Sequence, residues 1–168
     1  EVMAALPGPL HFTQEETGEV FTFPELLEEM GLEDLPEAKL HFSPDLTRKE
    51  LEVMIRELSA TEPIDQAWTR DLQEIERDLE GALDRYHTFA ENAPLPFFDR
   101  LYQYIFYRQL DKEASYGMEI LARYAQKSTQ FILLQAARTG DLLEAPRRWS
   151  EQIEYDTENV DLLLSQQI

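Results

Sequence analysis

The sequence predicts a mainly α-helical fold, an antiparallel bundle of long helices with a small N-terminal β-hairpin or three-stranded element. Three observations predict it: an apolar heptad pattern in mid-chain, an aromatic run after a proline-rich turn, and short alternating stretches near the N-terminus. Hydrophobic residues make up 43% of the 168, enough for the core of one ordinary domain. We expect residues 1–45 to form an N-terminal arm with a small β and helical element, 46–140 the bundle, and 141–168 an acidic amphipathic segment of the same domain.

The N-terminal element is predicted from short stretches with partial alternation of apolar and polar residues. They are LHFT (10–13), EVFTF (19–23) and KLHF (39–42), and residues 1–9 before them form an irregular arm. Thr17-Gly18 offers the positive φ angle that closes a hairpin. Between the second and third stretches, a short helix is expected to start at Pro24 and to stop at Gly31.

The bundle is predicted to contain helices over 46–60, 64–91 and 97–138. Thr47 and Glu50 have the spacing of a capping box and begin the first helix. The second helix has the clearest period, with apolar residues spaced by three and four at Trp68, Leu72, Ile75, Leu79, Ala82, Tyr86 and Phe89. The linker NAPLP is short, so the third helix runs antiparallel and stops near Gly140. A possible break near 111–117 leaves open whether 97–138 is one helix or two.

The run FFDRLYQYIFYRQL (97–110) is unusually apolar and aromatic for an acidic chain. At 100° per residue its apolar side chains spread over an arc of about 200°, whereas a helix on one face of a core needs a little over about 100°. One neighbouring layer therefore leaves part of the run uncovered. Three alternatives for the second cover stay open: the chain's own C-terminal segment, a second copy in a homodimer, or another protein.

The charge of the chain narrows the classes of partner. Acids number 34 against 15 bases, which gives a net charge of −19, and the acids concentrate in the two terminal parts. Such a field repels nucleic-acid phosphates and anionic lipids, so we expect no direct nucleic-acid partner and no membrane partner. The sequence has no apolar run long enough to span a bilayer and no signal segment, and a cytoplasmic location is the default expectation.

Several chemistries are excluded or disfavoured by the residues themselves. Without cysteine there is no thiolate nucleophile and no thiolate metal ligand, and neither a Gly-x-Ser-x-Gly turn, a glycine-rich phosphate loop nor an HExxH motif occurs. We therefore expect no enzyme, no catalytic residues and no cofactor. A carboxylate-bundle metalloprotein is a second alternative, because Asp84 and His87 approximate one Glu-x-x-His motif with Glu80 a turn earlier. These three residues lie on the flank of their helix, so no metal is expected.

The sequence favours a non-enzymatic protein–protein interaction or regulatory adaptor protein. It would act through an aromatic edge of the bundle and through acidic terminal segments that steer a basic partner; self-association as a homodimer is the other form. The residues expected to bind the partner are Tyr104, Tyr107, Trp149, Leu162, Leu163 and Leu164. The first alternative is an acidic nucleic-acid mimic that inhibits a DNA- or RNA-binding protein, since acid-studded helices imitate the phosphate spacing of a duplex.

Overall fold

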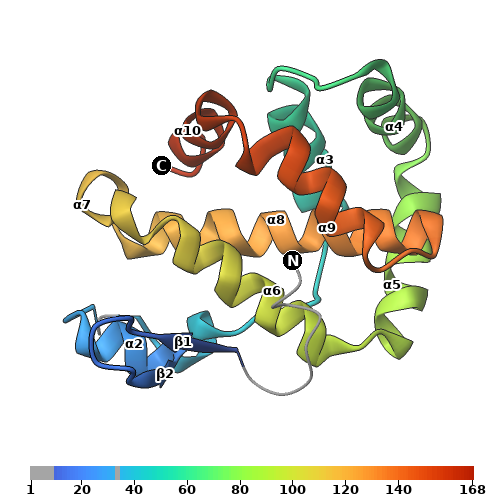
Figure 1. Cartoon of the computed structure of the whole chain (residues 1–168). Helices are drawn as coiled ribbons and strands as arrows, with labels where there is room; N and C mark the ends of the chain where they lie inside the picture. The colour runs from blue at the N-terminus through green and yellow to red at the C-terminus, as the bar shows by residue number, and fades with distance from the viewer. Residues whose placement is uncertain (1–9, 33–34) are drawn as a thin grey trace.

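Helix α8 (Met118–Thr139) runs through the middle of the molecule in the computed structural model, which describes residues 10–32 and 35–168 (Figure 1). Fourteen of its 22 residues are buried, so neighbours cover it on more than one side. These neighbours are α5 (Leu79–Asn92), α6 (Leu95–Arg108), α9 (Glu144–Trp149) and α10 (Thr157–Ser165). The mainly α-helical bundle and the small N-terminal hairpin predicted from the sequence are confirmed.

The first bundle helix, α3 (Arg48–Ser59), packs against α4 (Gln66–Arg77) and α5. The capping box forms as predicted: the Thr47 side chain accepts from the Glu50 backbone N–H, and the Glu50 side chain accepts from the Thr47 N–H. At the far end of α8, Gly140 adopts a φ of 75° and terminates the helix, again as predicted.

The single long helix predicted over 64–91 is wrong, because the chain breaks at Asp78 into α4 and α5. Asp78 has φ −142° and ψ 67°, which are not helical, and its Oδ1 accepts from the Gly81 N–H at 3.0 Å as the N-cap of α5. A Cβ on Gly81 would lie 2.2 Å from Asp78 Oδ2, so the glycine leaves room for this cap. The heptad stripe therefore divides, with α4 packing on α3 and α5 packing on α3 and α8.

The aromatic run and the long helix after it are also two elements, which settles the point left open by the sequence. Helix α6 ends at Arg108, and a 3₁₀ turn (η2, Leu110–Lys112) and one helical turn (α7, Glu113–Tyr116) follow. Gly117, with φ 84°, then starts α8. The break lets α6 fold back and pack along α8.

The N-terminal element is a two-stranded antiparallel hairpin of β1 (His11–Thr13) and β2 (Val20–Thr22), with Gly18 at φ 73° in its turn. It leads into the expected short helix, α2 (Phe23–Glu29). The third predicted stretch, KLHF, is not a strand: its first two residues, Lys39 and Leu40, end a 3₁₀ turn (η1, Glu37–Leu40). The Lys39 and Leu40 carbonyls accept from Tyr102 and Gln103 of α6 instead of a strand. The predicted arm over 1–9 lies outside the described residues.

The C-terminal segment folds back into the core. After α9 comes a single π-helical turn (η3, Ser150–Glu154), and then α10. Gln152 and Asn159 are both buried, and their amides bond the backbone of Glu62 and Ile64 in the α3–α4 linker at 2.6 to 3.0 Å. None of the described helices combines the length and the apolar character needed to cross a membrane.

Candidate functional site

The second flank of α6 is covered by the chain's own N-terminal part. The Phe23 ring lies 5.2 Å from the Phe106 ring, and the Phe12 ring lies 4.4 Å from that of Tyr107. In Figure 1 the hairpin and α2 lie beside α6, away from α10. The wide apolar arc of 97–110 is thus covered within one chain, by a segment that is none of the three covers predicted from the sequence.

What remains exposed at the C-terminal end of α6 is a patch that we call the tyrosine surface: Tyr104, Tyr107, Arg108 and Tyr155. Tyr107 is 41% exposed and Tyr155 67% exposed, whereas Tyr104 is half-buried. Arg108 Nη1 donates to the Tyr104 hydroxyl at 3.4 Å, and its guanidinium carbon lies 5.9 Å from that ring centre. Tyr104, Tyr107 and Arg108 are neighbours because they are spaced by three and four on one helix. Tyr155 follows the π-helical turn and lies close enough to Arg108 to interact with it electrostatically.

A carboxyl group, Glu154, is buried beneath this surface. Gln109 Nε2 donates to its Oε2 at 2.8 Å, while its Oε1 is buried and has no hydrogen-bond partner among the described residues. Burial raises the pKa of Glu154 to about 7, against the opposing effects of Arg108, Tyr124, Gln109 and Lys112. Glu154 can therefore gain or lose its proton close to neutral pH.

The nearest titratable neighbour of Glu154 on α8 is Tyr124, whose hydroxyl is also buried and unpartnered among the described residues. Burial, with the Glu154 charge added, raises the pKa of Tyr124 well above its usual range, so the phenol stays protonated. Glu154 ends the π-helical turn, in which the Tyr155 N–H reaches the Ser150 carbonyl at 2.9 Å. Such turns are rare and are frequent at functional sites.

The predicted partner-binding residues divide between surface and core. Tyr104 and Tyr107 lie at the surface, whereas Trp149, Leu163 and Leu164 are each less than 5% exposed and Leu162 is half-buried. The Trp149 ring packs between Trp68 at 6.4 Å and Phe131 at 5.8 Å. A role for Trp149 and the leucines in binding a partner stays a prediction, and it would require the C-terminal segment to open.

Arg108, Glu154 and Tyr155 were missed at the sequence level. Tyr155 carried a usable signal, because it is an aromatic residue set among acids in IEYDTE, where no apolar helical stripe includes it. Arg108 and Glu154 carried none, since an acidic chain offers many such residues and only the fold brings these two together.

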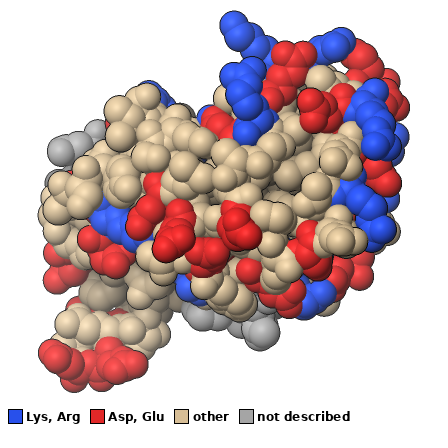
Figure 2. Space-filling view, turned by 90° about the horizontal axis from the view of Figure 1, so that it is seen from above, with Lys and Arg blue, Asp and Glu red and all other residues tan. Residues whose placement is uncertain are grey.

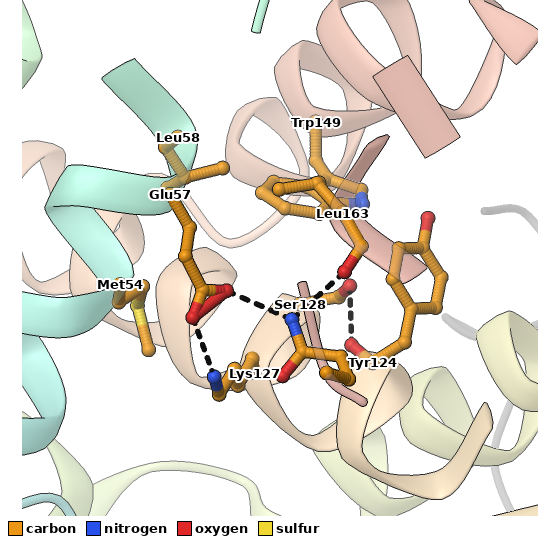
Figure 3. A pocket seen from close by; sticks show the side chains of 9 residues that line it. Met54, Glu57, Leu58, Tyr124, Lys127, Ser128, Trp149 and Leu163 are labelled. Atoms are coloured by element: carbon orange, nitrogen blue, oxygen red, sulfur yellow. Dashed lines mark hydrogen bonds and ion pairs between the residues drawn. The ribbon is translucent and has the colours of Figure 1, made fainter. Parts of the chain in front are cut away.

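A small pocket of about 20 Å³ lies between α3, α8 and the C-terminal segment (Figure 3). On one side Lys127 Nζ pairs with Glu57 Oε1 at 2.7 Å, and Gln167 Nε2 donates to Glu57 Oε2 at 2.8 Å. On the other side lie the Tyr124 and Trp149 rings. Trp149 Nε1 is buried without a partner among the described residues.

Two of the three residues considered for a metal site, Glu80 and His87, are engaged elsewhere. Glu80 Oε1 accepts from Arg48 at 2.6 Å, and His87 Nε2 lies 3.1 Å from the Leu46 carbonyl oxygen. Across residues 10–32 and 35–168, no three side chains of His, Cys, Asp or Glu come together in a way that could hold a metal ion.

The charges of the bundle are mostly mixed. Figure 2 shows acidic side chains scattered across the face seen from above, with basic side chains gathered mainly along one side. Several acids of the long helices are paired, such as Glu57 with Lys127 and Glu74 with Arg138, both at 2.7 Å. Residues 150–168 carry five acids and no Lys or Arg, and two of these acids pair with bases elsewhere in the chain: Glu151 with Arg147, and Asp161 with Lys112 at 2.8 Å.

Comparison with protein-family models, with curated proteins and with solved structures finds no match for this chain.

Proposed function

We propose that this protein is a non-enzymatic interaction or regulatory protein that binds a basic protein partner through the tyrosine surface. The observation that carries the proposal is the exposure of two tyrosines, Tyr107 next to Arg108 in the chain and Tyr155 within electrostatic reach of Arg108, in a fold where every other described aromatic side chain is buried or half-buried. A cytoplasmic setting is part of the proposal.

The composition of the tyrosine surface suits a binding face. Tyrosine and arginine are enriched among residues that dominate binding energy, because they bury much area with few rotors and keep polar groups for hydrogen bonds. Arg108 already contacts the Tyr104 ring, so part of the ordering cost is met before the partner arrives.

The charge around the surface indicates a basic partner. Tyr155 belongs to the segment 150–168, which contains no Lys or Arg and in which Asp156 and Glu158 form no ion pair with a described residue, and the whole chain carries −19. Complementary charge raises the rate of association and rejects acidic competitors. Binding should therefore weaken as salt is added, since surface charges are screened over about 8 Å at physiological ionic strength.

The proposal is tested by capture from native lysate with three immobilised proteins: the wild type, the double variant Tyr107→Ala/Tyr155→Ala, and Leu143→Ala. Leu143 is 64% exposed and lies outside the tyrosine surface, so it controls for loss of exposed apolar area. We expect the wild type and Leu143→Ala to capture the same basic proteins. The double variant should fail to capture them. Equal capture by all three would refute the proposal.

Light scattering separates a foreign partner from a second copy. If the tyrosine surface serves a homodimer, the wild type has twice the mass of the chain and the double variant returns to one chain mass. If the wild type stays monomeric, the tyrosine surface does not serve a homodimer, and its partner is another protein.

Nucleic-acid mimicry is the weaker proposal. A mimic needs acids in an unbroken row, whereas acids of α3, α4 and α5 pair with bases, including Glu57, Glu74 and Glu80.

A further inference from the structure

A cleft of about 420 Å³ opens between α3 and α8, on residues distinct from the tyrosine surface. Its volume lies within the range of roughly 300–1,000 Å³ typical of small-molecule sites. Its charged lining consists of Lys49 and Glu50 from α3 and of Arg123 and Lys127 from α8. Val53 and Met54 supply its apolar part.

The balance of charge in the cleft is opposite to that of the whole chain. Acids outnumber bases by 34 to 15 in the sequence, yet three bases and one acid line the cleft. The acid, Glu50, is held at the start of α3 because its Oε1 accepts from the Thr47 N–H at 2.9 Å. If Glu57, the partner of Lys127, is also counted, three positive charges face two negative ones.

Two of these bases are available to a ligand. Within the part of the chain that the structure describes, Lys49 makes no hydrogen bond and no ion pair, and its side chain is exposed. Arg123 donates from Nη1 to the Gln167 carbonyl at 2.8 Å, forms no ion pair with a described carboxylate, and keeps further N–H groups. Its neighbour Glu119 is paired with Lys39. The guanidinium fork suits a carboxylate or phosphate group.

The walls of the cleft are fixed by hydrogen bonds. Gln126 accepts from the Ser43 N–H at 3.2 Å and donates to the Ser43 carbonyl at 2.7 Å, while Gln130 donates to the Asp45 carbonyl at 2.7 Å. These bonds tie the segment that precedes α3 to α8. The spacing of the two helices is thus set before a ligand binds, which lowers the cost of binding.

We infer that this cleft binds a small organic anion, a molecule with one carboxylate, sulfonate or phosphate group on an apolar body. The acidic group lies at Lys49 and Arg123, and the apolar body lies on Val53 and Met54. Charge complementarity selects the anion, since a cation would meet the net positive side of the cleft.

The test uses octanoate as the probe in isothermal titration calorimetry, with inorganic phosphate and octanol as comparisons. We expect octanoate to bind more tightly than either, because phosphate lacks the apolar body and octanol lacks the charge. The double variant Lys49→Gln/Arg123→Gln should lose affinity for octanoate about tenfold, the sum expected for two exposed ion pairs. The matched control is Arg56→Gln/Arg85→Gln, which removes the same charge from exposed residues outside the cleft.

Two results would overturn the inference: no octanoate binding at millimolar concentration, or equal affinity in the two double variants. If phosphate binds as tightly as octanoate, the apolar body of the ligand does not contribute to binding, which contradicts the inference. The variant Tyr107→Ala/Tyr155→Ala should bind octanoate like the wild type, so this test stands apart from the partner proposal. Circular dichroism of each variant establishes that it is folded.

Discussion

Replacing Glu154 with Gln is predicted to stabilise the protein at pH 8 and to change its stability little at pH 5. The pKa of this carboxyl is raised from its ordinary value of 4.5 to about 7 by burial, so the folded protein holds the proton more tightly than the unfolded chain does. The proton therefore favours folding. The free energy of unfolding falls as the pH rises from about 4.5 to about 7 and stays low above that range.

The size of the effect follows from the two pKa values. The difference between 4.5 and about 7 corresponds to ~3 kcal/mol at most. The carboxyl is buried but the residue as a whole is half-buried, so water screens part of the charge and we expect about 2 kcal/mol in practice. Glutamine keeps the shape of the side chain, accepts from Gln109, and carries no charge at either pH.

The assay is urea unfolding followed by circular dichroism, at pH 5 and pH 8, for the wild type and for Glu154→Gln. Glu76→Gln is the control, because Glu76 is exposed and its replacement removes the same charge from a chain of net charge −19. If Glu154→Gln changes the free energy of unfolding equally at the two pH values, or behaves like Glu76→Gln, the reasoning is refuted.

Three further predictions follow from individual contacts. Asp78→Ala should lower the free energy of unfolding by about 1 kcal/mol, measured with urea, because it removes the N-cap of α5; an unchanged midpoint would contradict that role. The pKa of His41 is raised by its hydrogen bond to Asp99, so wild-type stability should decline as the pH rises above 6.5, and His41→Gln should lose that part of the decline. Trp149→Ala should cost about 3–5 kcal/mol in urea unfolding, whereas Tyr155→Ala should stay within about 0.5 kcal/mol; similar costs would mean that the C-terminal segment is not part of the core.

Local signals predicted the elements of this fold well. Thr47 and Glu50 gave the start of α3, Gly31 the end of the short helix, and Gly140 the end of α8, because caps and positive φ angles depend on a few adjacent residues. The heptad pattern misled because periodicity continues across Asp78, where one side-chain cap outweighs it.

Long-range pairing was much harder to foresee. The sequence offered three covers for the aromatic run, and the actual cover, Phe12 and Phe23 with the hairpin, depends on contacts between residues nearly a hundred positions apart. For the same reason the apolar tail was expected at a partner interface. Its buried amides, Gln152 and Asn159, are polar residues that bond the backbone of the linker after α3. This role depends on a long-range contact that no local pattern predicts.

The most direct test of the central claim is photocrosslinking from the tyrosine surface. A benzophenone side chain is placed at position 155 in one protein and at position 143 in another, since both native side chains are more than 60% exposed. We predict that position 155 crosslinks to a basic protein in native lysate, that added salt suppresses this product, and that position 143 gives no such product. The same crosslinks from both positions, or none from position 155, would contradict the assignment of the tyrosine surface as the binding face.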